Sequence, residues 1–162
     1  RFNQTVAEIF SQNTTLIVRT GVKKIGSLKI RDEDGDLGDI DVLVVDRKRK
    51  RLLLVECKDL AQARTPYEMG SEIINLFRGS PDKKPIVLLH QRRIEWTRKH
   101  LNELLHWLDI KMTKGWKVES LIVVDRELFT PYLESSPIPI KAIEKLRDEF
   151  AASPAKKRKN RA

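Results

Sequence analysis

The sequence has few of the features that mark secreted or membrane proteins. It holds a single cysteine, which excludes an internal disulfide and fits a reducing compartment. It contains no apolar run that approaches the length of a membrane span, and no signal-peptide pattern. We therefore expect an intracellular protein with no membrane partner, although the sequence does not separate cytoplasm from nucleus.

Two common kinds of metal site are also missing. The three histidines have no spacing typical of a metal cluster, and we assign them no catalytic role. The acidic run Asp32–Asp36 does not form a calcium loop, because Leu37 stands where that loop needs its glycine and Leu43 where it needs its glutamate. The run is better interpreted as a solvated turn around Asp34 and Gly35.

Basic residues are in excess: 32 Lys+Arg stand against 23 Asp+Glu, for a net charge of +9. Such an excess favours a polyanionic partner. Five of these charges lie in residues 151–162, so the preceding residues carry only +4. We expect residues 1–150 to form one domain and residues 151–162 a disordered tail, either a nucleic-acid arm, which we favour, or a nuclear-import signal. Because the chain begins at Arg1 without methionine, we also expect processing or a longer parent chain with further domains.

The stretch from Asp34 to Asp59 is the most informative. Its two apolar runs, Ile40–Val45 and Leu52–Val55, predict short buried strands joined by a basic hairpin connection. An acidic residue, Asp41, lies inside the first run. The second run ends in Glu56-Cys57-Lys58.

Strand geometry brings these polar groups together. Side chains alternate between faces, so Glu56 and Lys58 point one way and Cys57 points the other way, into the core. In an antiparallel pair Asp41 lies beside Glu56. Carboxylates next to buried strands cost several kcal/mol unless they are paired or hold a metal. Mg²⁺, which binds hard oxygen ligands and phosphate oxygens, fits such a pair and predicts phosphodiester hydrolysis; a plain salt bridge from Lys58 to Glu56 is the alternative.

The segment Gly38–Asp41, followed after fourteen residues by Glu56-Cys57-Lys58, resembles the signature of the PD-(D/E)xK, or restriction-endonuclease-like, nuclease superfamily. That family carries an acid on one core strand and the (D/E)xK element on the next. The resemblance implies that Asp41 and Glu56 bind Mg²⁺, with Mn²⁺ as a substitute, and that the backbone carbonyl of Cys57 joins them. Lys58 is then the catalytic lysine.

Family members often carry a further glutamate on the helix before these strands, and the resemblance gives that role to Glu8. Thr5-x-x-Glu8 also fits a helix capping box, so both interpretations stay open. Asp39 is a second candidate ligand, for which a surface role is favoured. Ile40 stands where the family signature has proline.

Nucleic-acid contacts are predicted at exposed basic and aromatic positions. The Gln-x-x-x-Tyr element of one branch of the superfamily is absent, because Gln62 and Tyr67 lie one residue too far apart. Tyr67 remains a candidate contact at the mouth of the site, with packing on the sheet as the alternative. The basic candidates for phosphate contacts are Arg92, Arg93, Arg98 and Lys99.

The pattern as a whole predicts an α/β fold: a restriction-endonuclease-like core in which helices flank a mixed central sheet. The expected helices cover residues 2–12, 65–79, 86–108 and 143–150, and the other expected strands cover 14–20, 22–30 and 118–125, with a break at Gly21. We predict a Mg²⁺-dependent nuclease, preferably an endonuclease acting on DNA rather than RNA, and leave a homodimer open. The alternative is a non-catalytic module that binds nucleic acid or protein on the same fold.

Overall fold

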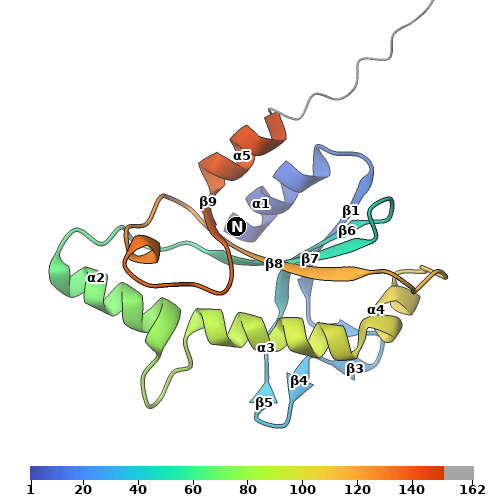
Figure 1. Ribbon diagram of the computed structural model, residues 1–162, viewed down its shortest axis with the longest axis horizontal. Helices are drawn as coiled ribbons and strands as arrows, with labels where there is room; N and C mark the ends of the chain where they lie inside the picture. The colour runs from blue at the N-terminus through green and yellow to red at the C-terminus, as the bar shows by residue number, and fades with distance from the viewer. Residues whose placement is uncertain (152–162) are drawn as a thin grey trace, which may run out of the picture.

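The computed structural model describes residues 1–151, and Figure 1 shows their arrangement. Residues 152–162, which make up nearly all of the predicted basic tail, lie outside the described residues. The first helix, α1 (Phe2–Ser11), and the last, α5 (Ile143–Ala151), lie side by side above the sheet. No helix of the described part has the length and apolar character needed to cross a membrane.

The centre of the fold is a five-stranded sheet in the order β1-β6-β7-β8-β9. Its strands are β1 (Leu16–Val22), β6 (Ile40–Asp46), β7 (Arg51–Lys58), β8 (Lys117–Val124) and β9 (Ile140–Ala142). β1, β6 and β7 pair antiparallel, whereas β8 pairs in parallel with β7 and β9 pairs in parallel with β8. The sheet is therefore mixed, as predicted, and β6–β7 is the expected hairpin.

Both faces of the sheet are covered, which explains the continuous apolar runs of its central strands. α1 and α5 cover one face and pack on Val42 and Val44. α3 (Ile86–Lys99) and α4 (Leu101–Trp107) cover the other face, where the alternate residues of β6 and β7 pack. Side-chain alternation thus divides each strand between two cores.

Two predictions about the backbone between α1 and β6 are wrong: the strand break at Gly21, and a continuous strand over residues 22–30. Gly21 does not break the strand: β1 continues through it, with φ of +59°, and pairs with β6 on both sides. Two short hairpins follow β1 and lead into β6. They consist of β2 (Lys24–Ile25) with β3 (Leu28–Lys29) and β4 (Arg31–Asp32) with β5 (Gly35–Asp36).

The helical half of the chain corrects one further expectation. The single helix expected over residues 86–108 is two helices, because His100 leaves the helical conformation between α3 and α4. α2 (Pro66–Ile73) begins in a capping box of Thr65 and Glu68 and continues into η1 (Ile74–Arg78). Glu72 on α2 is buried and accepts a hydrogen bond from Thr130 in η2 (Thr130–Tyr132).

Candidate active site at one end of the sheet

The three acidic and basic residues of the sequence motif lie at the same end of the central hairpin. Asp41 is the second residue of β6, and Glu56 and Lys58 are near the end of β7. Val42 pairs with Val55, so the register places Asp41 directly opposite Glu56. The structure therefore brings together the residues that the sequence singled out.

Asp41 is half-buried beside Glu56. Its Oδ2 accepts a hydrogen bond from the backbone N–H of Cys57 at 2.8 Å. Burial raises the pKa of the Asp41 carboxyl, and the negative charge of Glu56 raises it further, against the opposing effects of the Cys57 hydrogen bond and of Lys58. Two carboxylates that repel each other in a partly dry setting form a site that a cation would stabilise.

Glu56 itself is buried, with 3% of its surface exposed, and two cations reach its carboxylate. Lys58 Nζ lies 2.8 Å from Oε1, and Arg93 Nη1 donates to Oε2. The salt bridge that the sequence left open as an alternative is therefore present. When all four are ionised, Asp41, Glu56, Lys58 and Arg93 together carry no net charge.

Arg93 and His90 come from one side of α3 and were not assigned to the site from sequence. Arg93 Nε also donates to the carbonyl oxygen of Leu37 at 2.6 Å. His90 lies one turn earlier, with Nε2 3.2 Å from the Leu54 carbonyl oxygen and Nδ1 4.0 Å from Glu56 Oε2. Burial is the main cause that lowers the pKa of His90 to about 4, so its imidazole is neutral at pH 7.

A periodic signal for these two residues does exist in the sequence. His90 and Arg93 lie at helical spacing with Val87, Ile94 and Trp96, all buried on the side of α3 that faces the sheet. A histidine and an arginine in phase with an apolar stripe must have buried polar partners. Arg93 is thus part of the core rather than of a surface that contacts phosphates.

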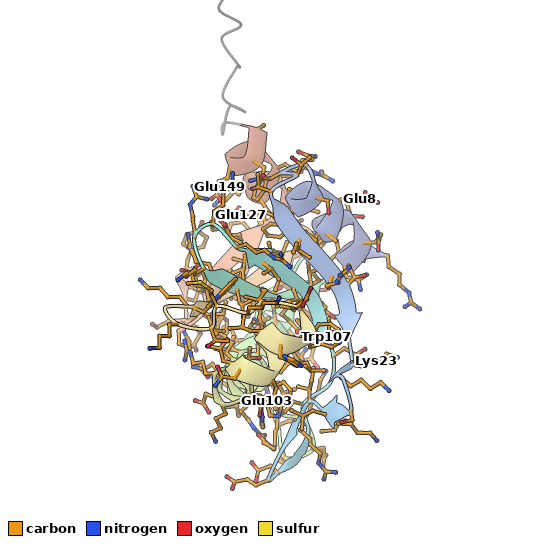
Figure 2. All side chains as sticks on the ribbon, turned by 90° about the vertical axis from the view of Figure 1, so that its right-hand side faces the viewer. Glu8, Lys23, Glu103, Trp107, Glu127 and Glu149 are labelled. Atoms are coloured by element: carbon orange, nitrogen blue, oxygen red, sulfur yellow. The ribbon has the colours of Figure 1, made fainter. Side chains whose placement is uncertain are left out.

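The other predicted residues lie elsewhere. Glu8 is exposed on α1, and Figure 2 shows it on the opposite side of the sheet from Glu103 and Trp107 of α4. The capping-box interpretation of Thr5 and Glu8 is wrong, because α1 already begins at Phe2 and Thr5 donates to a carbonyl inside the first turn.

Among the candidates for nucleic-acid contacts, Arg92 is engaged within the protein. Its guanidinium binds Asp32, with Nε 2.7 Å from Oδ2, and lies 3.1 Å from Asp34. The acidic run is therefore not simply solvated, because two of its carboxylates pair with the positive charge of Arg92 on α3. The candidates with exposed side chains are Tyr67, Arg98 and Lys99, and Asp39, the second candidate ligand, is half-buried just before β6.

The donor atoms at this end of the sheet fit a hard divalent cation. No cluster of three or more histidine, cysteine, aspartate or glutamate side chains suited to a metal occurs in residues 1–151. Asp41 and Glu56 supply two carboxylates, and the Cys57 carbonyl is adjacent in the chain. Mg²⁺ at phosphate-transfer sites commonly takes one or two carboxylates and keeps several waters, so two suffice.

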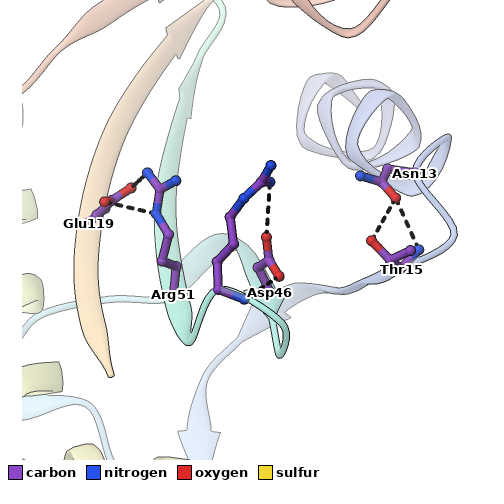
Figure 3. Close-up of polar contacts among 6 residues, drawn as sticks. Asn13, Thr15, Asp46, Arg51 and Glu119 are labelled. Carbon is purple, nitrogen blue, oxygen red and sulfur yellow. Dashed lines mark hydrogen bonds and ion pairs between the residues drawn. The ribbon is translucent and has the colours of Figure 1, made fainter. Parts of the chain in front are cut away.

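A groove of about 810 Å³ lies at the other end of the sheet and on the α1–α5 face. Its charged walls are paired within the protein: Arg51 with Glu119, as Figure 3 shows, and Arg49 with Asp46 at 3.4 Å. Asn13 and Thr15 bond to each other beside them. The residues of the motif do not line this groove.

One solved structure supports the fold. The chain is similar to the crystal structure of the small subunit, R.BspD6I2, of the heterodimeric restriction endonuclease R.BspD6I, with a TM-score of 0.50 and 12% identity over 93% of this chain and 67% of that one. A lower similarity, with a TM-score of 0.39 and 13% identity, relates 93% of the chain to 30% of protein VC1899 from Vibrio cholerae. The search of curated proteins found no match. The restriction-endonuclease-like core predicted from sequence is confirmed.

The family comparison covers the part of the chain that holds the site. A family model described as anti-phage protein Upx-like matches residues 1–125, from α1 to the end of β8. Asp41, Glu56, Lys58 and Arg93 all lie within this match. The chain belongs to the Upx-like family of anti-phage proteins.

Proposed function

We propose that this protein is a metal-dependent nuclease of the PD-(D/E)xK type, which hydrolyses phosphodiester bonds, preferably in DNA, during defence against phage. The observation that carries this proposal is the position of Asp41 opposite Glu56, with Lys58 two residues further along β7. The fold, shared with a restriction endonuclease subunit, and the anti-phage family support it.

Each residue has a distinct role in this mechanism. Asp41 and Glu56 would hold Mg²⁺, or Mn²⁺ in its place, together with the Cys57 carbonyl. When bound, the cation supplies a Lewis acid for the scissile phosphate. Lys58, which is one-third exposed, orients the attacking water and stabilises the negative charge that develops on the phosphate oxygens.

A cleavage assay tests this function. Labelled single- and double-stranded DNA and RNA are incubated with the protein and Mg²⁺, Mn²⁺ or a chelator, and circular DNA separates endonuclease from exonuclease action. We expect metal-dependent cleavage that is lost in Asp41→Ala and in Lys58→Ala. Asp39→Ala should keep its activity; if it does not, Asp39 is a ligand as well.

A non-catalytic binding module is the second candidate, and one observation favours it. Glu56 is already compensated by Lys58 and Arg93, so the site is stable as an ion-pair cluster without a metal. Under this function the wild-type protein binds nucleic acid, and neither Mg²⁺ nor Mn²⁺ produces cleavage. Asp41→Ala would then leave binding unchanged.

A further inference from the structure

Arg93 is the feature of the site that the proposed mechanism does not use. Its side chain is 8% exposed and reaches from α3 across to the end of β7. It is held at both ends of its guanidinium, by Glu56 Oε2 and by the Leu37 carbonyl oxygen. The neighbouring backbone is close as well, because a Cβ at Gly38 (φ +74°) would lie 3.6 Å from Arg93 Nη2.

Each carboxylate oxygen of Glu56 already has a cationic partner. Lys58 contacts Oε1 and Arg93 contacts Oε2. A divalent cation that binds Glu56 must therefore share this carboxylate with two resident cations, both of which repel it. It must also enter a cluster whose net charge is already zero, so that the cluster becomes positive.

We propose that Arg93 is the resident counter-ion of Glu56 and competes with the divalent cation for this carboxylate. The free protein then binds the cation weakly, and the cation enters together with nucleic acid, whose phosphates supply the missing negative charge. This inference rests on the proposed nuclease function and adds a regulation to it. Metal binding and nucleic-acid binding strengthen each other, and the coupling is reciprocal.

His90 cannot replace Arg93 as a hydrogen-bond donor to Glu56. Its Nε2–H faces the Leu54 carbonyl, so Nδ1 carries a lone pair and offers no proton to Glu56, 4.0 Å away. Nδ1 has no hydrogen-bond partner among the described residues. With Arg93 displaced, α3 offers Glu56 no second donor, and Oε2 becomes available to the metal.

Metal affinity, measured apart from cleavage, tests the competition. Binding of Mn²⁺ is followed by electron paramagnetic resonance and calorimetry, with and without a non-cleavable phosphorothioate DNA duplex. Without DNA, Arg93→Gln should bind Mn²⁺ at least about tenfold more tightly than wild type, because one positive charge is removed next to the site. Arg93→Lys, the matched control, keeps the charge and should bind like wild type. DNA should tighten binding more in wild type than in Arg93→Gln.

A second variant tests the competition without changing the buried Arg93, whose replacement could disturb folding. Lys58→Met removes the other cation from a partly exposed position and should also tighten Mn²⁺ binding without DNA. Thermal unfolding confirms that each variant is folded. Affinities in Arg93→Gln and Lys58→Met that equal or fall below that of wild type overturn the inference, even if wild type cleaves DNA and the nuclease function stands.

The remaining outcomes separate the two claims. Tighter binding in the variants without cleavage by any protein supports the competition and rejects the nuclease. An absence of Mn²⁺ binding in every variant, with and without DNA, overturns the competition, and a simultaneous absence of cleavage rejects the nuclease as well.

Discussion

The two ends of the strands β6, β7 and β8 carry acidic residues in opposite settings. At the turn end, Asp46 pairs with Arg49 at 3.4 Å and Glu119 with Arg51 at 2.9 Å, and both arginine side chains are exposed. At the other end, Glu56 is buried, meets two cations and faces a second carboxylate. The same sheet thus has simple one-to-one ion pairs at the turn end and a buried cluster of two carboxylates and two cations at the other end.

The difference shows which end is built for chemistry. Exposed one-to-one pairs contribute roughly 0–1 kcal/mol, and their presence follows from a charged surface. A buried cluster with two adjacent carboxylates brings a desolvation cost that stability alone does not explain, since apolar residues of similar size often stabilise as well. Perturbed ionisable groups gathered in this way are typical of functional sites.

The largest contrast is expected in catalysis. Glu56→Gln should reduce metal-dependent cleavage by about a thousandfold, the upper range for losing one pre-organised charge-stabilising group. Glu119→Gln, which removes the same kind of charge from the turn end, should stay within about twofold of wild type. Initial cleavage rates of the two purified variants decide this. Equal losses would mean that the site is not at the Asp41 end.

Stability should show the next largest contrast. Arg93→Met leaves Glu56 buried with only Lys58, and should cost about 4 kcal/mol of unfolding free energy, within the range for breaking a buried ion pair. Arg51→Met breaks the exposed pair with Glu119 and should cost under about 1 kcal/mol. Urea unfolding at pH 7 measures both. A small loss in Arg93→Met would show that Lys58 alone compensates Glu56.

We expect His90 to make the free energy of unfolding depend on pH, with an effect similar in size to that of Arg93→Met. Its folded-state pKa of about 4 lies below the ordinary value of 6.5, so the stability it contributes is complete above pH 6.5 and is lost as the pH falls toward 4. The loss over this interval is about 3 kcal/mol. His90→Gln should remove this part of the slope in urea unfolding between pH 7 and pH 4. The exposed control, His106→Gln, should keep the wild-type slope.

Much of the fold followed from periodicity, because apolar runs and capping residues are local signals. The β6–β7 hairpin, β8 and the start of α2 lie where the sequence placed them. The short strands β2–β5 and β9 did not follow, since each has only two or three residues and depends on its neighbours. His100 ends a helix without proline or glycine, so its break depends on tertiary packing that no local pattern records.

The site was predictable in part for the same reason. Alternation along β7 placed Glu56 and Lys58 on one face, and the hairpin register placed Asp41 beside them. The contribution of α3 was missed, because Arg93 was interpreted as one of a basic run. Its contact with Glu56 spans 37 residues of sequence and requires the sheet and helix to be packed.

The smallest expected difference between the two ends of the sheet is in the stability of Asp41→Asn and Asp46→Asn. Burial and Glu56 raise its pKa, so its protonated form is favoured by folding, and the stability present below the ordinary aspartate pKa is lost as the pH rises through the raised value. Asp41→Asn can still accept the Cys57 hydrogen bond and should raise the urea midpoint at pH 7, with a gain that shrinks in acid. Asp46→Asn only loses the Arg49 pair, so its midpoint should not rise.

Added Mg²⁺ with DNA should stabilise wild type and not Asp41→Asn, because a ligand stabilises only the protein that binds it. A midpoint of Asp41→Asn below that of wild type at pH 7 would mean that the two carboxylates do not repel each other, and the case for a cation site between them would fail.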